Sequence, residues 1–196
     1  MRLLLATTNP NKVREIRGIL ADAPVELLTL SDFPPIPEPD ETGVTFQENA
    51  RLKAHYYAEL HPMTTVAEDS GLVVDALGGE PGVRSARFLR PDATYAERFA
   101  EIFRRLAERR DAPRTARFVC AVAVVRGGNV IFETTGTVEG EISDAPRGSG
   151  GFGYDPIFYY PPYGSTFGEV TEERKLAVAH RGAAFRELAD WLRRSH

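Results

Sequence analysis

The sequence predicts an α/β fold built on a mixed β-sheet, and its apolar pattern gives the reasons. The run Leu3–Ala6 is short and entirely apolar, which is typical of a strand covered on both faces. The apolar run Phe118–Val125 and the return strand Val130–Thr137 flank Gly127-Gly128 and predict a hairpin. A hairpin beside a buried strand combines antiparallel with parallel pairing, so the sheet is expected to be mixed.

Helices are predicted wherever a capping residue precedes an apolar repeat. One helix is expected to run to about Leu60, where Pro62 stops it, and another carries the buried stripe of a core-facing helix. The capping boxes are Thr45 with Glu48 and Thr94 with Glu97, and the stripe is Phe99, Ile102, Phe103 and Leu106.

The composition excludes several classes of protein. No apolar run approaches the roughly 20 residues that cross a bilayer, and charges follow the first apolar stretch at once, so we expect a cytoplasmic protein without a membrane segment. The lone Cys120 lies in an apolar run and is expected to be a buried hydrophobe. A net charge of −4 argues against a general nucleic-acid surface, so any phosphate chemistry must use local basic groups.

The first loop combines a strand end with a helix start. Asn9 is a good N-cap and Pro10 suits the first helical position, so free backbone N–H groups and the positive end of the helix dipole would face an anion. Lys12 would add a positive charge, although the phosphate-loop pattern GxxxxGKS/T is absent. A plain capped helix explains the loop equally well. The candidate phosphate ligands are Thr7, Thr8, Asn9, Pro10, Asn11 and Lys12.

The stretch Val66–Val74 interrupts an apolar strand pattern with Glu68-Asp69-Ser70-Gly71. Buried polar groups need partners, so we expect these residues at the mouth of a strand and not in its interior. Strand side chains alternate, so only one of the two carboxylates can face a given site. Such oxygen ligands suit Mg²⁺, although a solvated turn is the alternative.

Further acidic residues lie nearby in the sequence. Asp40 and Glu41 on a loop, and Glu48 on the first turn of the next helix, are candidates to supplement the metal site. On that helix Asn49 and Lys53 lie one above the other. A capped, solvated helix start explains Glu48 by itself.

A glycine-rich loop precedes Tyr154, and its backbone is free to pass close to a ligand. Phe152 and Tyr154 on such a loop could stack on a purine or could pin the loop onto the core. Further along, Lys175, His180 and Arg181 cannot share one face of a continuous helix. The helix must therefore break near His180 if they are to receive a phosphate or a base edge.

Taken together, these segments resemble the inosine and xanthosine triphosphate pyrophosphatases, which remove deaminated purine nucleotides. The resemblance covers almost the whole chain, in order. It comprises Thr7–Lys12 with Val13-Arg14-Glu15, Glu41–Gly43 followed by Thr45–Ala50, Asp69–Leu72, Ala76–Gly79 through Ser85–Arg87, Gly151–Pro156, and Lys175 with His180–Gly182. Thr8 departs from a frequent glycine and Glu68 from a common aspartate.

The resemblance implies an elongated α/β fold with a long twisted mixed sheet, forming a single domain over residues 1–196 with two lobes around a central cleft. It also implies a homodimer and Mg²⁺-dependent cleavage of ITP, dITP or XTP to the monophosphate and pyrophosphate. By position, Thr7–Lys12 would hold the triphosphate, Asp69 would bind metal and activate water, and Glu41 or Asp40 would support the metal. Substrate contacts would come from Ser70, Phe152, Gly153, Tyr154, Asp155, Lys175, His180 and Arg181.

The chain contains no Ser–His–Asp signature, and hydrolysis of a phosphoanhydride needs charge neutralisation and an aligned water more than a covalent nucleophile. A donor such as a backbone N–H or Arg181 would be satisfied by a 6-oxo purine and left unpaired by adenine. Two alternatives stay open: a pyrophosphatase for modified pyrimidine or general deoxynucleoside triphosphates, and a module that binds nucleotides without cleaving them.

Overall fold

The computed structural model describes residues 1–109 and 111–195. Its strands form one sheet in the order β2-β1-β3-β4-β5-β6-β7. β1 pairs in parallel with β2 and β3, whereas β6 pairs antiparallel with β5 and β7, so the predicted mixed sheet is confirmed. The strands are β1 Arg2–Leu5, β2 Glu26–Thr29, β3 Thr64–Val74, β4 Thr115–Arg126, β5 Asn129–Ile142, β6 Phe158–Tyr160 and β7 Ser165–Thr166.

The helices begin where the capping residues predict. Asn9 Oδ1 accepts from the backbone N–H of Asn11 and Lys12, and both predicted capping boxes are closed. The break expected near His180 is confirmed, because Ala179 is extended and a new helix begins at the next residue. The helices are α1 Pro10–Ile19, α2 Phe46–Leu60, α3 Tyr95–Ala107, α4 Glu172–Val178 and α5 His180–Arg194. Within the described residues, none of them is long and apolar enough to cross a membrane.

The chain divides into two compact units. Unit 1 comprises Met1–Asp69, Cys120–Gly136 and His180–His196, and unit 2 comprises Ser70–Val119 and Thr137–Ala179. The long strands β3, β4 and β5 therefore contribute residues to both units.

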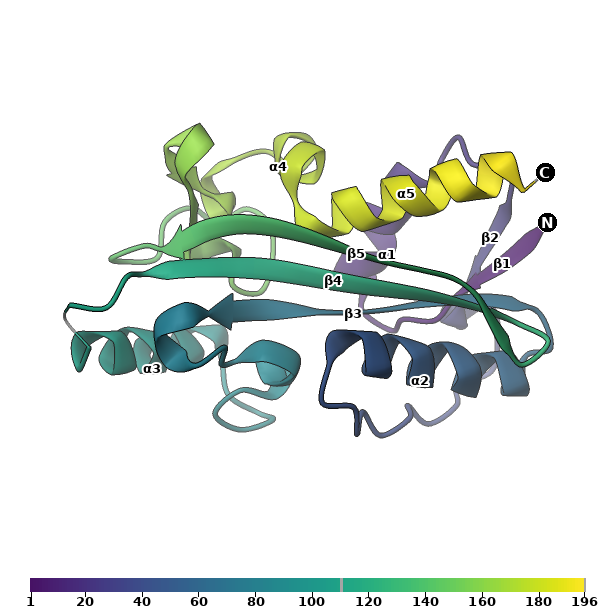
Figure 1. Cartoon of the computed structure of the whole chain (residues 1–196), viewed down its shortest axis with the longest axis horizontal. Coiled ribbons are helices and arrows are strands. Elements are labelled where there is room, and N and C mark those ends of the chain that lie inside the picture. Colours follow the sequence, from purple (N-terminus) through teal and green to yellow (C-terminus); the bar gives the residue numbers. More distant parts are fainter. Residues whose placement is uncertain (110, 196) are drawn as a thin grey trace. The chain divides into compact units, whose positions relative to one another are not determined.

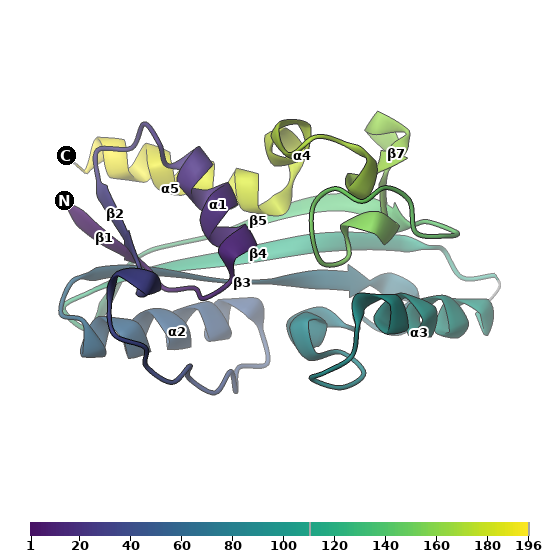
Figure 2. The same cartoon turned by 180° about the vertical axis from the view of Figure 1, so that it is seen from behind.

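In unit 1, α1 and α5 lie on one face of the strands and α2 lies on the other (Figure 1), and Figure 2 shows the same layers from behind. Leu3 and Leu5 of β1 and Val66 of β3 pack with Ile16 of α1 and Phe185 of α5. Burial on both faces explains why β1 is apolar from Leu3 to Leu5, after the exposed Arg2. Cys120 is fully buried in this core, as expected.

Unit 2 has its own core. The apolar stripe of α3 packs against strand residues such as Leu72 and Phe118, and Phe158 and Phe167 add aromatic contacts. Tyr154 of the glycine-rich loop belongs to this core.

The structure corrects one prediction. The stretch Glu68–Gly71 does not lie at the mouth of a strand, because β3 runs without interruption from Thr64 to Val74. Both carboxylates are buried in the strand, Glu68 at 1% and Asp69 at 5% exposure. Polar groups are tolerated there because helices on each face supply their partners, as described below.

Candidate active site

Asp69 lies at the centre of a polar cluster on the α2 face of β3. Lys53 Nζ is 3.1 Å from Asp69 Oδ1 and 2.7 Å from Glu41 Oε1, so one ammonium joins two carboxylates. Asn49 Nδ2 donates to the other carboxylate oxygen of Asp69 at 3.1 Å. Asn49 and Lys53 are four residues apart on α2, which places both side chains on the same face of that helix.

The surroundings of Asp69 raise the pKa of its carboxyl. Burial raises the pKa of the Asp69 carboxyl above its ordinary value, and the charge of Lys53 only partly opposes the shift. Burial would lower the pKa of Lys53, but the charges of Asp69, Glu68 and Glu41 outweigh burial and raise it. Lys53 is therefore a firmly held cation beside a carboxylate that binds its proton more readily than usual.

Glu68 points to the opposite face of β3, towards α1 and α5. Its carboxylate contacts the ammonium of Lys12, and Arg181 Nη2 lies 3.6 Å from its Oε2. Arg181 Nη1 also donates to Glu15 Oε2 at 2.6 Å, and Cys120 Sγ lies 3.3 Å from Glu68 Oε2. Burial alone would raise the pKa of Glu68, but Lys12, Arg181 and Lys53 hold it well below its ordinary range.

Arg181 is held by buried carboxylates. Its guanidinium is 2% exposed and bridges two buried carboxylates, and it belongs to unit 1. His180, at the start of the same helix, is 4% exposed. The alternative of a solvated arginine at a helix junction is wrong, because Arg181 is buried.

In the first loop, Asn9 caps the start of α1, as predicted. The N–H groups of Asn11 and Lys12 donate to Asn9 Oδ1 at 3.0 and 3.3 Å, and Asn9 N donates to Thr7 Oγ1 at 3.3 Å. A pocket of about 860 Å³ in unit 1 is bordered by Thr7, Thr8 and Pro10, together with Arg14 and Arg17 of α1. The loop therefore lies beside a largely apolar pocket with two arginines at its border. The N–H groups of Asn11 and Lys12 are already used by the cap.

The donors around Lys53 fit a hard divalent cation. Asp69 and Glu41 supply carboxylate oxygens, the ligand type that Mg²⁺ prefers, and both contact the ammonium of Lys53. Asp40 is exposed and is not brought to this pair. In residues 1–109 and 111–195, no group of three or more His, Cys, Asp and Glu side chains is arranged to hold a metal. Of the two residues expected to support Asp69, Glu41 shares a cation with it in this structure.

In unit 2 the glycine-rich loop is built around a buried ion pair. Lys175 Nζ donates to Asp155 Oδ2 at 2.6 Å, with both side chains 2% exposed. The same oxygen accepts from Phe152 N at 2.8 Å, and Lys175 Nζ lies 4.6 Å from the centre of the Phe152 ring. Gly151 has φ +68°, and a Cβ there would lie 2.1 Å from Asp155 Oδ2. Glycine is thus required where the backbone meets this carboxylate.

The two loop aromatics differ in role. Tyr154 is 4% exposed and its hydroxyl donates to the Ser85 carbonyl at 2.8 Å, so Tyr154 pins the loop to the core. Phe152 is only half-buried. Phe152, and not Tyr154, is therefore the ring that remains accessible to a base.

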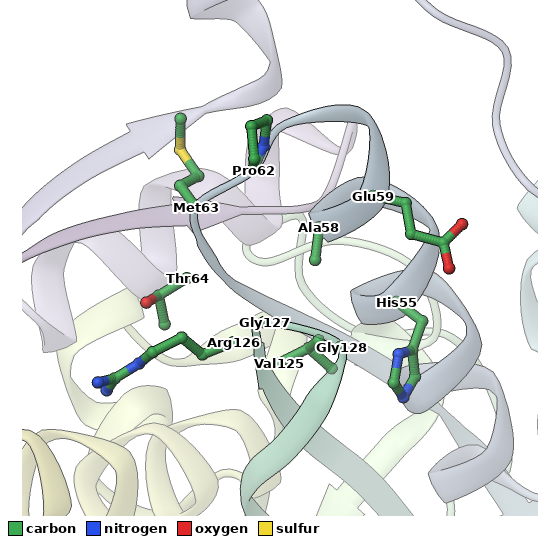
Figure 3. Close-up of a pocket in the computed structure, with 10 residues that line it drawn as sticks. All are labelled: His55, Ala58, Glu59, Pro62, Met63, Thr64, Val125, Arg126, Gly127 and Gly128. Atoms are coloured by element: carbon green, nitrogen blue, oxygen red, sulfur yellow. The ribbon is translucent and has the colours of Figure 1, made fainter.

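Two further features are Ser70, which was predicted as a substrate contact, and a second pocket in unit 1. Ser70 is half-buried and is the first residue of unit 2, directly after Asp69. Figure 3 shows a pocket of about 390 Å³ in unit 1, where His55 and Glu59 of α2 lie near the hairpin between β4 and β5. None of its lining residues was predicted as a site residue.

Sequence reasoning assigned no function to Asn49 or Lys53, although both contact Asp69 directly. Their spacing of four residues on a predicted helix was visible in the sequence. That spacing places two side chains together but does not show what they face. Glu15 belongs to a segment that carries the family resemblance, but its pairing with Arg181 was not predicted, because 166 positions separate the two residues.

Comparison with known proteins agrees with this picture. Residues 3–191 match the Ham1 family. A dITP/XTP pyrophosphatase of Geobacillus kaustophilus is 46% identical over 186 residues, covering 95% of this chain and 91% of the relative. One of Thermus thermophilus is 47% identical over 190 residues, covering 97% and 91%. The structure of a HAM1 protein from Coxiella burnetii superposes with a TM-score of 0.93 at 37% identity, covering 99% of each chain. The chain therefore belongs to the Ham1 family.

Proposed function

We propose that this chain hydrolyses the triphosphates of deaminated purine nucleosides, ITP, dITP and XTP, to the monophosphate and pyrophosphate. The observation that carries the proposal is the buried cluster in which the Lys53 ammonium joins Asp69 and Glu41. Family membership and the names of the relatives, dITP/XTP pyrophosphatases, support the substrate class.

Asp69 is the proposed catalytic residue. Hydrolysis of a phosphoanhydride requires an oriented water and neutralisation of the phosphate charge. A carboxylate whose pKa burial has raised takes a proton from water more readily than an ordinary aspartate does, and Asn49 and Lys53 hold its two oxygens in place. Asp69 would thus orient the attacking water and accept its proton.

Asp69 and Glu41 are also the residues proposed to hold Mg²⁺. When bound, the ion supplies positive charge that neutralises phosphate oxygens and lowers the pKa of coordinated water. Lys53 would keep both carboxylates ionised and correctly spaced. The residues Thr7–Lys12 are proposed to bind the triphosphate, with Lys12 held in position by Glu68.

Base recognition is assigned to residues 152–155 of unit 2. The half-buried Phe152 offers a face for a purine, and Lys175 beside it is a donor suited to a 6-oxo group. Adenine carries an amino donor at that position and would leave such a group unpaired, which costs about 1–3 kcal/mol. We further propose that the enzyme is cytoplasmic. We also propose that it is a homodimer, which light scattering of the purified protein would test.

A substrate panel tests the function. Purified protein with Mg²⁺ is incubated with ITP, dITP, XTP, GTP, ATP and dUTP, and released pyrophosphate is measured. We expect rapid turnover of the first three and at least about tenfold lower kcat/KM for GTP and ATP. Asp69→Asn should abolish turnover while leaving nucleotide binding measurable.

Other outcomes would separate the alternatives. Equal turnover of ITP and ATP would remove the purine specificity, and preference for dUTP would indicate a pyrimidine enzyme. Binding of ITP without any pyrophosphate release by the unaltered protein would indicate a nucleotide-binding module. Full activity of Asp69→Asn would remove Asp69 from the chemistry.

A further inference from the structure

Arg98 is a buried charge without a carboxylate partner. It lies on α3 in unit 2 and is 4% exposed. In the part of the chain that the structure describes, its Nη2 donates to the Pro91 carbonyl at 3.4 Å, and its buried Nε has no acceptor. Burying a cation without a counterion disfavours folding, so stability does not explain this residue.

The remaining surroundings of Arg98 are aromatic. Its guanidinium carbon lies 4.9 Å from the centre of the Tyr95 ring, one turn earlier on the helix. Burial raises the pKa of Tyr154, whereas the charge of Arg98 and a side-chain hydrogen bond with it oppose that shift. The rings of Tyr95 and Tyr154 meet edge to face, with centroids 5.3 Å apart and planes at 90°. Arg98 is therefore the cation shared by an ordered pair of tyrosines.

These two tyrosines hold the loop of residues 152–155. Tyr154 is part of the loop, and its hydroxyl is fixed by the Ser85 carbonyl. Tyr95 lies next to Gly153. A Cβ added at Gly153 would lie 3.6 Å from the Tyr95 hydroxyl oxygen. On its other side the loop is held by the Asp155–Lys175 ion pair. The loop is thus fixed by two sets of contacts, of which one depends on Arg98.

We propose that Arg98 is a positioning residue for base recognition. It orients Tyr95 and Tyr154, and through them fixes residues 152–155, while taking no part in cleavage of the phosphoanhydride. The inference rests on the proposed function, in which this loop contacts the purine.

The test removes the charge while keeping an unbranched, flexible side chain. Arg98→Met should raise KM for ITP about fivefold and change kcat by less than about twofold, because a cation–π contact of ordinary strength is lost at a distance from the chemistry. Hydrogen exchange of the backbone amides of residues 152–155 should become faster. The urea midpoint of unfolding should not fall, because an unpaired buried charge has been removed. Arg98→Lys should give a KM for ITP between those of Arg98→Met and the unaltered protein.

Two controls separate positioning from general effects. Arg105→Met removes an arginine from the same helix whose guanidinium lies over Phe88 at 5.2 Å, and it should leave KM unchanged. If Arg98 acts through Tyr95, then Arg98→Met should have little further effect on KM in a Tyr95→Leu background.

Unchanged KM and unchanged exchange in Arg98→Met would overturn the proposal. A higher KM accompanied by a lower unfolding midpoint and faster exchange throughout unit 2 would also overturn it, since Arg98 would then be only structural. If the unaltered protein does not cleave ITP, the proposed function fails, while the exchange measurement still decides whether Arg98 fixes the loop.

Discussion

Asp69, the proposed catalytic base, is a buried carboxylate with a raised pKa. Its carboxylate is 5% exposed, and burial favours its neutral form, whereas Lys53 favours the ionised form. Burial is the stronger effect, so the pKa of Asp69 is raised. A base needs a pKa nearer to the working pH than that of an ordinary aspartate, and this arrangement supplies it.

The raised pKa predicts the pH dependence of activity. As the pH falls, the ionised form of Asp69 is lost on passing through a pKa above its ordinary value, so kcat/KM should decline earlier than for a solvated aspartate. Lys53→Met removes the cation that lowers this pKa, and it should move the acidic limb of the pH–rate profile to higher pH while reducing activity. Rates measured from pH 5 to 9 would check both effects.

Lys12→Met is the comparison variant for that measurement. The Lys12 charge also lowers the pKa of Asp69, but it ranks behind Lys53, so the acidic limb should move less. An acidic limb that stays in place in Lys53→Met would contradict the assignment of Asp69 as the base.

At the scale of elements, the junction between β5 and α5 is unusually close. A Cβ added at Gly136 of β5 would lie 2.1 Å from the His180 carbonyl oxygen and 2.7 Å from Ala184 N. These are backbone atoms of the first turns of α5, so no side chain can rotate to make room. This glycine allows α5 to pack directly on the strand.

Gly136→Ala should therefore lower the free energy of unfolding by about 2 kcal/mol or more, because the helix must move away from the strand. Gly18→Ala is the matched control, since Gly18 is exposed on α1 and a Cβ there meets nothing within 4 Å. The control should instead gain about 0.5–1 kcal/mol from reduced backbone entropy. Urea unfolding of both variants measures the difference, and equal stability would contradict the close packing.

At the scale of the whole molecule, neither compact unit is continuous in the sequence, and β3, β4 and β5 contribute to both. A strand cannot readily melt over half of its length while the other half stays ordered. We therefore propose that residues 1–196 form a single folding domain.

Unfolding should then occur in one transition. Trp191, the chain's only tryptophan, packs against Phe132 in unit 1, so its fluorescence reports that unit, whereas far-UV circular dichroism reports helices of both units. The two signals should give coincident urea curves. Two separated midpoints would show instead that the units fold independently.

The sequence by itself determined the features that depend on near neighbours. The apolar strand at Leu3–Ala6, the N-cap at Asn9, both capping boxes and the helix break before His180 were all predicted and are all present. Each is decided by residues within one turn or one strand, because propensity and capping act over that range. The mixed sheet followed from the strand pattern, and the identity of Asp69 as the central carboxylate came from the ordered motifs.

Only the tertiary structure decided which polar groups are paired. Glu68 and Asp69 were expected at the end of a strand because a buried carboxylate needs a partner, and that rule is correct. Their partners come from α1 and α5 on one face and from α2 on the other, and these are contacts between distant residues. A local pattern shows that a charge needs compensation, but only the folded chain shows where the compensating charge comes from. For that reason Asp69 was found from the sequence, whereas the roles of Lys53, Glu15 and Arg98 were not.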